Sequence, residues 1–135
     1  MGNTVLMRGE TVTAFTQELF QKAGMSEPDA KYHAECLVNT NYWGIDSHGV
    51  IRVPAYFKRM LNGAINTNPQ IKVVRGEGCL EVLDVDAAAG FIGGRAGMER
   101  AMDHAAVSGI AACASSTATT LEQAPSMPAW RLSGA

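Results

Sequence analysis

One short segment combines three side chains whose types and spacing could carry out chemistry. Ser47 and His48 are adjacent, and Arg52 follows about one helical turn later. An imidazole accepts and donates protons near neutral pH, and a guanidinium is a permanently charged, forked donor that matches a carboxylate. A proton carrier beside a carboxylate-binding group would suit the chemistry of a 2-hydroxy or 2-oxo acid.

The same residues have a structural alternative. Asp46 or Ser47 could cap the N-terminus of a helix, with His48 and Arg52 on its solvated first turn. From local chemistry alone, this capped helix is the simpler interpretation. A Ser-His hydrolase is rejected because the side chains of adjacent residues diverge in a helix or a strand, and no nucleophile elbow or orienting acid is evident.

A longer pattern around these residues resembles a known family. Residues 44–52 read Gly-Ile-Asp-Ser-His-Gly-Val-Ile-Arg, and Tyr56 and a Leu-Asn-Gly at 61–63 follow. This pattern resembles the N-terminal signature of the malate/L-lactate dehydrogenase family, whose members are NAD(P)-dependent oxidoreductases of 2-oxo and 2-hydroxy acids. They include ureidoglycolate, sulfolactate and diketogulonate enzymes, and they are distinct from the Rossmann-fold lactate and malate dehydrogenases. The resemblance extends over about residues 11–114.

The resemblance implies a role for each residue of the segment. His48 would be the catalytic acid/base, Arg52 would bind the substrate carboxylate, and Ser47 would orient the imidazole or contact the substrate. Gly49 would allow close approach of the backbone, and Asp46 would cap the helix or bias the histidine tautomer. The implied reaction is hydride exchange between NAD or NADP and a small malate- or lactate-like acid. The family also implies a homodimer, with cofactor-binding residues mostly beyond the chain end and no metal site.

Apolar periodicity predicts the elements that position this segment. Helices are expected over residues 10–23, 26–43, 53–62 and 90–107. A hairpin of strands 71–74 and 80–85 and a buried third strand over 110–114 complete the pattern. The residues expected to face inward lie on one stripe of each helix: Val12, Phe15 and Leu19; Ala30, Ala34 and Leu37; Val53, Tyr56, Phe57 and Met60; Met98, Met102 and Ala105.

These elements predict an α/β (α+β) fold in two parts. Residues 1–63 would form an N-terminal helical segment, and residues 64–114 would begin a central α/β domain with a mixed sheet. The glycines of residues 90–94 lack the spacing and the acidic partner of a Rossmann turn, so they are expected to serve close helix packing.

Other potential ligands in the sequence are isolated. His33 and Cys36 lie one turn apart, but no second pair accompanies them, so a surface histidine and a core cysteine are favoured over a metal site. His104 has no evident partner and is interpreted as structural. Three widely spaced cysteines predict reduced thiols in a cytoplasmic protein.

Composition limits the class of protein. The 135 residues are 47% hydrophobic, which suits one ordinary globular domain. Eleven basic and thirteen acidic residues give a net charge of −2, which predicts no binding to nucleic acid or to an anionic membrane. No apolar run is long enough to span a bilayer.

The sequence changes character at residue 115, and residues 115–135 are expected to be a linker-like, disordered tail. Family members would continue with a second histidine signature, commonly Asn-His-Phe-Gly. A shifted reading frame over codons 118–124 can spell Asn-His-Phe-Gly-Ala-Gly, so we hypothesise a frameshift, in the gene or in its sequencing, that its nucleotide sequence would test. Because family members are more than twice as long, this chain is expected to be truncated and inactive alone. The alternative is a catalytically inactive remnant or an interaction module.

Overall fold

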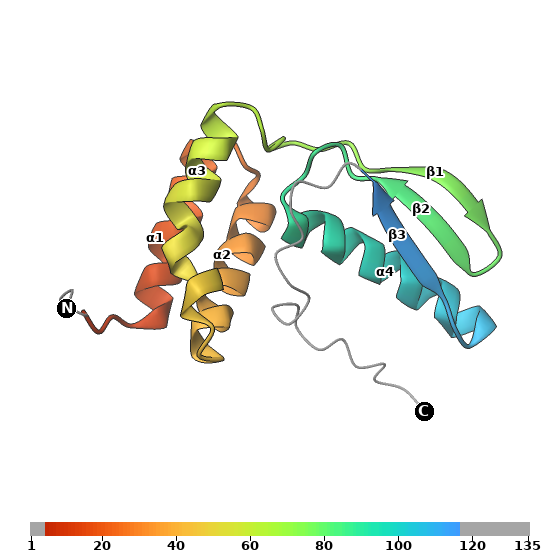
Figure 1. Ribbon diagram of the computed structural model, residues 1–135, viewed down its shortest axis with the longest axis horizontal. Coiled ribbons are helices and arrows are strands. Elements are labelled where there is room, and N and C mark those ends of the chain that lie inside the picture. The colour runs from red at the N-terminus through yellow and green to blue at the C-terminus, as the bar shows by residue number, and fades with distance from the viewer. Residues whose placement is uncertain (1–4, 117–135) are drawn as a thin grey trace.

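The computed structural model describes residues 5–116. Its elements follow in the order α1 (Gly9–Lys22), α2 (Glu27–Tyr42), α3 (Val53–Leu61), β1 (Lys72–Glu77), β2 (Leu80–Asp84), α4 (Gly90–Ser108) and β3 (Ala112–Ser116). Helices α1, α2 and α3 gather on one side of the molecule, and the sheet with α4 lies on the other (Figure 1). The disordered tail and the frameshift hypothesis lie outside the described residues, apart from residues 115 and 116, which belong to β3.

The start of α2 shows how local chemistry sets an element. Ser26 is the N-cap, and its hydroxyl accepts a hydrogen bond from the backbone N–H of Asp29 at 3.4 Å. Pro28 stands in the first turn, where its missing N–H costs nothing. The predicted start of this helix at residue 26 is therefore confirmed.

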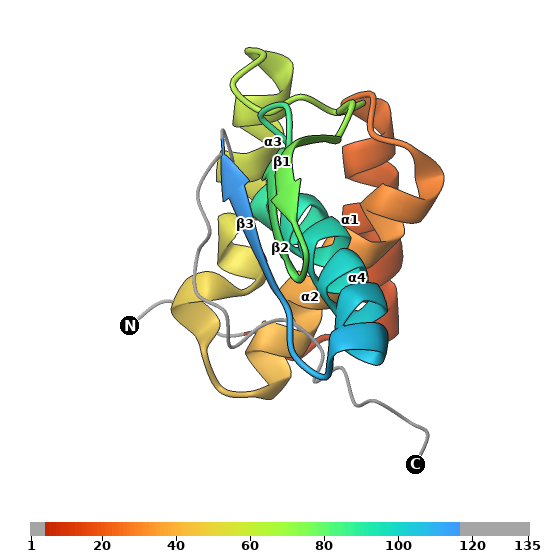
Figure 2. The ribbon, with the colours of Figure 1, turned by 90° about the vertical axis from the view of Figure 1, so that its right-hand side faces the viewer.

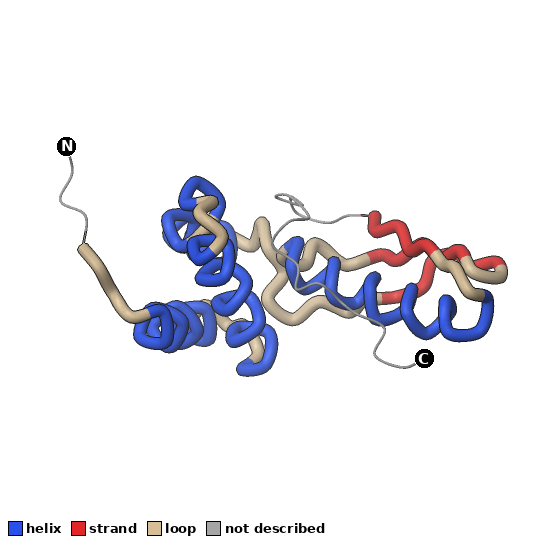
Figure 3. Tube along the Cα trace, turned by 90° about the horizontal axis from the view of Figure 1, so that it is seen from below, coloured by secondary structure: helices blue, strands red, loops and turns tan. Residues whose placement is uncertain are grey.

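The sheet is mixed, as the sequence predicts. Strand β1 pairs antiparallel with β2 through a two-residue turn at Gly78 and Cys79, and β2 pairs parallel with β3 across the α4 connection. The strand order is β1-β2-β3, so β3 lies at one edge. Helix α4 packs along one face of the sheet (Figure 2 and Figure 3). The predicted α/β fold class is confirmed.

The core lies where the helices meet α4 and β2. Its fully buried apolar side chains come from both parts of the chain: Phe20, Leu37, Ile65, Leu83 and Val85. Gly93 of α4 lies against Val85, because a Cβ added to the glycine would come within 3.2 Å of the valine side chain. This contact confirms the predicted close helix packing at Gly93.

Several predicted inward faces are wrong. Phe15 is 64% exposed and Met98 is 37% exposed, whereas Thr16 and Phe20 face the core from α1. Strand β3 is largely exposed rather than buried, because within residues 5–116 only β2 pairs with it and only α4 covers it. Among the described helices, none is long and apolar enough to cross a lipid bilayer.

The exposed stripe of α1 borders an apolar groove of about 560 Å³ that we call the α1–α3 groove. Its lining comes from α1, α3 and the segments before them: Met7, Val12, Phe15, Thr16, Leu19, Val50, Val53, Pro54 and Phe57. The predicted stripe of α1 thus faces a groove that no other described element fills.

Candidate active site

Residues 44–52 form a compact double turn between α2 and α3. Gly44 has a φ of 76°, which lets the chain reverse direction after α2. Two single 3-10 turns follow, Asp46–His48 and Val50–Arg52. Each is closed by a backbone hydrogen bond of 3.0 Å, from His48 N to the Ile45 carbonyl and from Arg52 N to the Gly49 carbonyl. Ser47, His48 and Arg52 therefore stand on one short, hydrogen-bonded scaffold.

The side chains of Ser47 and His48 meet rather than diverge. Ser47 Oγ lies 2.8 Å from His48 Nδ1, so the predicted divergence is wrong. It was argued for a helix or a strand, whereas a single 3-10 turn allows a short serine side chain to reach its neighbour's ring. Arg52 Nε donates to the Ser47 carbonyl at 2.9 Å, which holds the guanidinium to the same turn.

The serine-histidine contact does not make a hydrolase site. A serine nucleophile needs an imidazole that a carboxylate orients through its second nitrogen. Among residues 5–116, no carboxylate lies within hydrogen-bonding distance of His48. Ser47 Oγ instead occupies Nδ1, and Nε2 is the ring nitrogen to which no described residue hydrogen-bonds.

Asp46 is not an N-cap, because it lies inside the first 3-10 turn. The N-cap of that turn is Ile45, and no side chain caps it. Its carboxylate accepts a hydrogen bond of 2.5 Å from Asn41 Nδ2. Asn41 Oδ1 in turn accepts from the backbone N–H of Val50 at 2.8 Å. Sequence reasoning missed Asn41, since a polar residue near the end of a helix carries no distinguishing signal.

The absence of a side chain at Gly49 allows a close approach to its backbone. Within the described residues, the group that approaches is the Asn41 side chain. A Cβ added to Gly49 would overlap the Asn41 carboxamide. The glycine beside His48 was therefore the signal in the sequence that some side chain packs tightly against this turn.

His33 is buried rather than exposed on the helix surface. Its side chain has no solvent exposure, and neither ring nitrogen has a hydrogen-bond partner among the described residues. The rings of Phe20, Tyr56 and Phe91 surround it at centroid distances of 4.7–5.1 Å. Burial lowers the pKa of His33 to about 3. No group of three or more possible metal ligands occurs within residues 5–116.

His104 has a partner that the sequence did not reveal. Its Nε2 lies 3.0 Å from Glu81 Oε1, and Arg100 donates to both oxygens of the same carboxylate at 2.5 and 2.8 Å. The hydrogen bond from Arg100, and then that from His104, lowers the pKa of Glu81 to about 2. This ion cluster joins α4 to β2 on the side of the fold away from the double turn.

The N-terminus of α4 does not form a cradle for the phosphates of a dinucleotide. The N-terminus of α4 is a place where phosphate could bind in principle, but residues 90–93 are buried and Gly93 packs on Val85. None of the described residues is therefore assigned as a cofactor ligand.

Comparison with known proteins gives consistent similarities. Residues 7–125 match the family model described as malate/L-lactate dehydrogenase. The chain is 34% identical over 108 residues to a malate dehydrogenase of Pyrococcus abyssi, and the match covers 80% of this chain and 30% of that protein. It is 33% identical over 105 residues to hydroxycarboxylate dehydrogenase B of Escherichia coli, covering 78% and 29%.

Solved structures agree with this similarity. The sulfolactate dehydrogenase of Methanocaldococcus jannaschii superposes with a TM-score of 0.82 at 31% identity, covering 84% of this chain and 33% of that one. The malate dehydrogenase of Pyrococcus horikoshii gives a TM-score of 0.83 at 28% identity, covering 86% and 33%. The chain thus spans about a third of the length of the relatives that it matches.

Proposed function

Because the chain belongs to the malate/L-lactate dehydrogenase family, we propose that it carries the proton-transfer part of an oxidoreductase acting on 2-hydroxy and 2-oxo acids. The substrate class is that of malate or lactate, and the complete enzyme would use NAD or NADP. The 2.8 Å contact between Ser47 Oγ and His48 Nδ1 carries this proposal. It leaves Nε2 as the nitrogen that exchanges a proton with the substrate oxygen.

The roles of the three residues follow from their chemistry. A nicotinamide cofactor, when bound, would supply the hydride chemistry at C2 of the substrate. His48 Nε2 takes the hydroxyl proton during oxidation and returns it during reduction. Ser47 orients the imidazole through Nδ1. Arg52, which Ser47's carbonyl holds through Nε, binds the substrate carboxylate and so fixes the position of C2.

The remaining parts of the proposal concern the whole protein. We propose that residues 1–63 and 64–114 are the helical segment and the start of the central domain, and that residues 115–135 are an atypical tail. We further propose a homodimer in the cytoplasm that binds neither nucleic acid nor membrane. Three free cysteines and the modest net charge support this setting.

An inactive remnant or interaction module is the second candidate. The α1–α3 groove favours it, together with the edge of β3 that no strand within residues 5–116 pairs with. Monomeric proteins rarely leave large apolar surfaces uncovered. The N-terminus of α4 is closed to a phosphate by its packing on Val85, and we propose that this chain alone is inactive.

Reduction of a panel of 2-oxo acids, followed by the loss of NADH or NADPH absorbance, tests the function. The assay compares this chain with a version extended to the length of its relatives, each with a His48→Ala variant. Removing a general acid/base is expected to lower kcat of the extended enzyme by roughly 10²–10⁴. His104→Ala is the matched control, because His104 bonds to Glu81 and should leave kcat unchanged. Activity that survives in His48→Ala would refute the assignment.

A further inference from the structure

Asn41 connects the end of α2 to both halves of the double turn. Its Nδ2 donates to Asp46 Oδ1 at 2.5 Å in the first 3-10 turn. Its Oδ1 accepts from Val50 N at 2.8 Å at the start of the second. A single carboxamide thus uses its donor and its acceptor to fasten the residues on either side of Ser47 and His48.

The packing of Gly49 makes this arrangement tight. A side chain at position 49 would overlap the Asn41 carboxamide, so the glycine and the asparagine fit only as a pair. Most other hydrogen bonds of the double turn run within it, as from Gly49 N to the Asp46 carbonyl and from Arg52 Nε to the Ser47 carbonyl. Backbone bonds from Gly44 N to the Asn41 carbonyl at 2.9 Å and from Ile45 N to the Thr40 carbonyl at 3.1 Å tie the entry of the first turn to α2. The Asn41 side chain adds the link from α2 to the second turn.

We propose that Asn41 is a positioning residue that holds the double turn so that Ser47 Oγ stays on His48 Nδ1 and Nε2 is presented to the substrate. The catalytic consequence rests on the proposed function, whereas the positioning itself does not. Asn41 hydrogen-bonds to neither ring nitrogen of His48. It acts through Asp46, Gly49 and Val50, and its effect should appear in the state of the His48 ring.

The pair of Asn41 and Asp46 can be inverted without changing the net charge. Asn41→Asp alone removes the donor and sets two carboxylates against each other, which should open the turn. Adding Asp46→Asn restores a complementary pair, because the new carboxylate at position 41 can accept from both the new carboxamide at position 46 and Val50 N. Asp46→Asn alone keeps a hydrogen-bond acceptor facing Asn41, so it serves as the conservative control. A double-mutant cycle of this kind isolates the pairwise effect.

The test is ¹⁵N NMR of the 135-residue chain labelled at the histidine ring nitrogens. His33 and His104 lie elsewhere in the fold and provide internal references. In the wild type and in Asp46→Asn, His48 should give separate Nδ1 and Nε2 signals that report a fixed Nδ1 hydrogen bond. In Asn41→Asp, Asn41→Ala and Gly49→Ala, these signals should move toward one averaged shift while the reference histidines stay unchanged.

The inverted pair decides the outcome. Recovery of the wild-type His48 spectrum in Asn41→Asp/Asp46→Asn supports the proposal. This result does not depend on whether the Asn41→Ala variant folds. An unchanged His48 spectrum in Asn41→Asp overturns it, and so does an inverted pair that remains like Asn41→Asp. Activity of the extended enzyme is measured separately. If the spectra respond as expected and no dehydrogenase activity is found, the positioning stands and the proposed function fails.

Discussion

The two nitrogens of the His48 imidazole have different surroundings, and this difference decides which nitrogen is available for proton transfer. Ser47 Oγ meets Nδ1, so a proton can enter or leave through Nε2 without disturbing that contact. A histidine on an ordinary exposed helix turn would lack this asymmetry, because both nitrogens would face water. The double turn therefore matters more to the proposed chemistry than the sequence order of Ser47 and His48.

The imidazole of His33, unlike that of His48, is fully buried, and burial keeps it neutral. The unfolded chain takes up a proton near pH 6.5, whereas burial lowers the pKa in the folded protein to about 3. Between these values the unfolded state binds more protons, so stability falls as the pH falls. The stabilisation that comes from neutral His33 is fully present above about pH 6.5 and is lost as the pH falls toward 3. Over this range the free energy of unfolding changes by at most about 1.4 kcal/mol per pH unit because of this residue.

His33→Phe should remove this slope, because a phenyl ring suits the aromatic surroundings and does not titrate. Urea unfolding of the wild type and the variant at several pH values between about 3 and 7 measures the difference. His104→Gln, which keeps His33, should retain the wild-type dependence between about pH 5 and 7, above the range in which the Glu81 carboxylate that His104 contacts takes up a proton. Parallel pH profiles for the wild type and His33→Phe would contradict the prediction.

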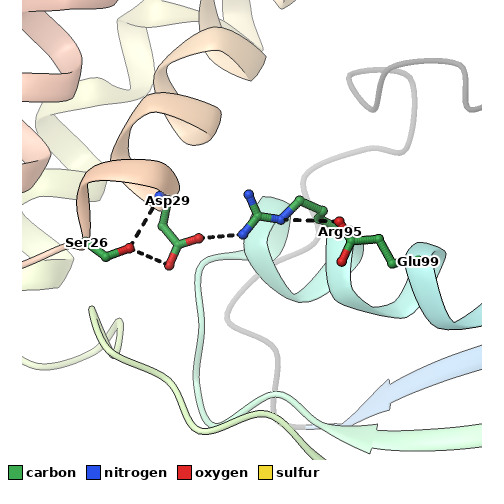
Figure 4. Close-up of polar contacts among 4 residues, drawn as sticks. All are labelled: Ser26, Asp29, Arg95 and Glu99. Carbon is green, nitrogen blue, oxygen red and sulfur yellow. Dashed lines mark hydrogen bonds and ion pairs between the residues drawn. The ribbon is translucent and has the colours of Figure 1, made fainter.

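At the scale of the elements, α2 and α4 are joined by an ion pair. Arg95 Nη2 lies 2.5 Å from Asp29 Oδ1, and both side chains are largely buried, at 26% and 20% exposure. Ser26 donates to the other oxygen of Asp29, and Glu99 lies 4.0 Å from Arg95 Nε (Figure 4). The guanidinium also covers the ring of Tyr32 at 4.7 Å. These contacts fix α4 against the helix that precedes the double turn.

Arg95→Ala should therefore destabilise the fold by about 1–3 kcal/mol, since a hydrogen bond to a charged group and a cation–π contact are lost together. Lys22→Ala is the matched control, because its ion pair with Glu18 is exposed at 70% and 65% and should leave the unfolding midpoint unchanged. Equal urea midpoints for Arg95→Ala and the wild type would mean that the pair does not hold α2 and α4 together.

The elements themselves were well predicted from local signals. The cap at Ser26 and the glycine stop at Gly109, whose φ is 79°, act within a few residues and leave a clear pattern. The partners of His33 and His104 could not be predicted in the same way. His33 meets Phe91, and His104 meets Glu81, only through tertiary packing of distant segments.

At the scale of the molecule, the sequence predicted which helices have an apolar face, but not which of these faces other elements pack against. The stripe of α1 has helical period, yet Phe20 enters the core whereas Phe15 lines the α1–α3 groove. The strand predicted over residues 110–114 is apolar in composition, yet β3 stands at the edge of the described sheet. Periodicity gives an amphipathic face, and only the elements packed against it decide whether that face is buried.

Phe15 and Phe20 provide a direct test of this distinction, because they are the same residue type on one helix. Phe20 is fully buried, so Phe20→Ala should cost about 3–5 kcal/mol. Phe15 is 64% exposed, so Phe15→Ser should change the free energy of unfolding by less than about 0.5 kcal/mol. The same substitution should reduce binding of a hydrophobic dye, because it breaks the apolar lining of the groove. If Phe15→Ser destabilises the chain as strongly as Phe20→Ala, the groove is closed in solution, and Phe15 belongs to an interface that holds the chain together.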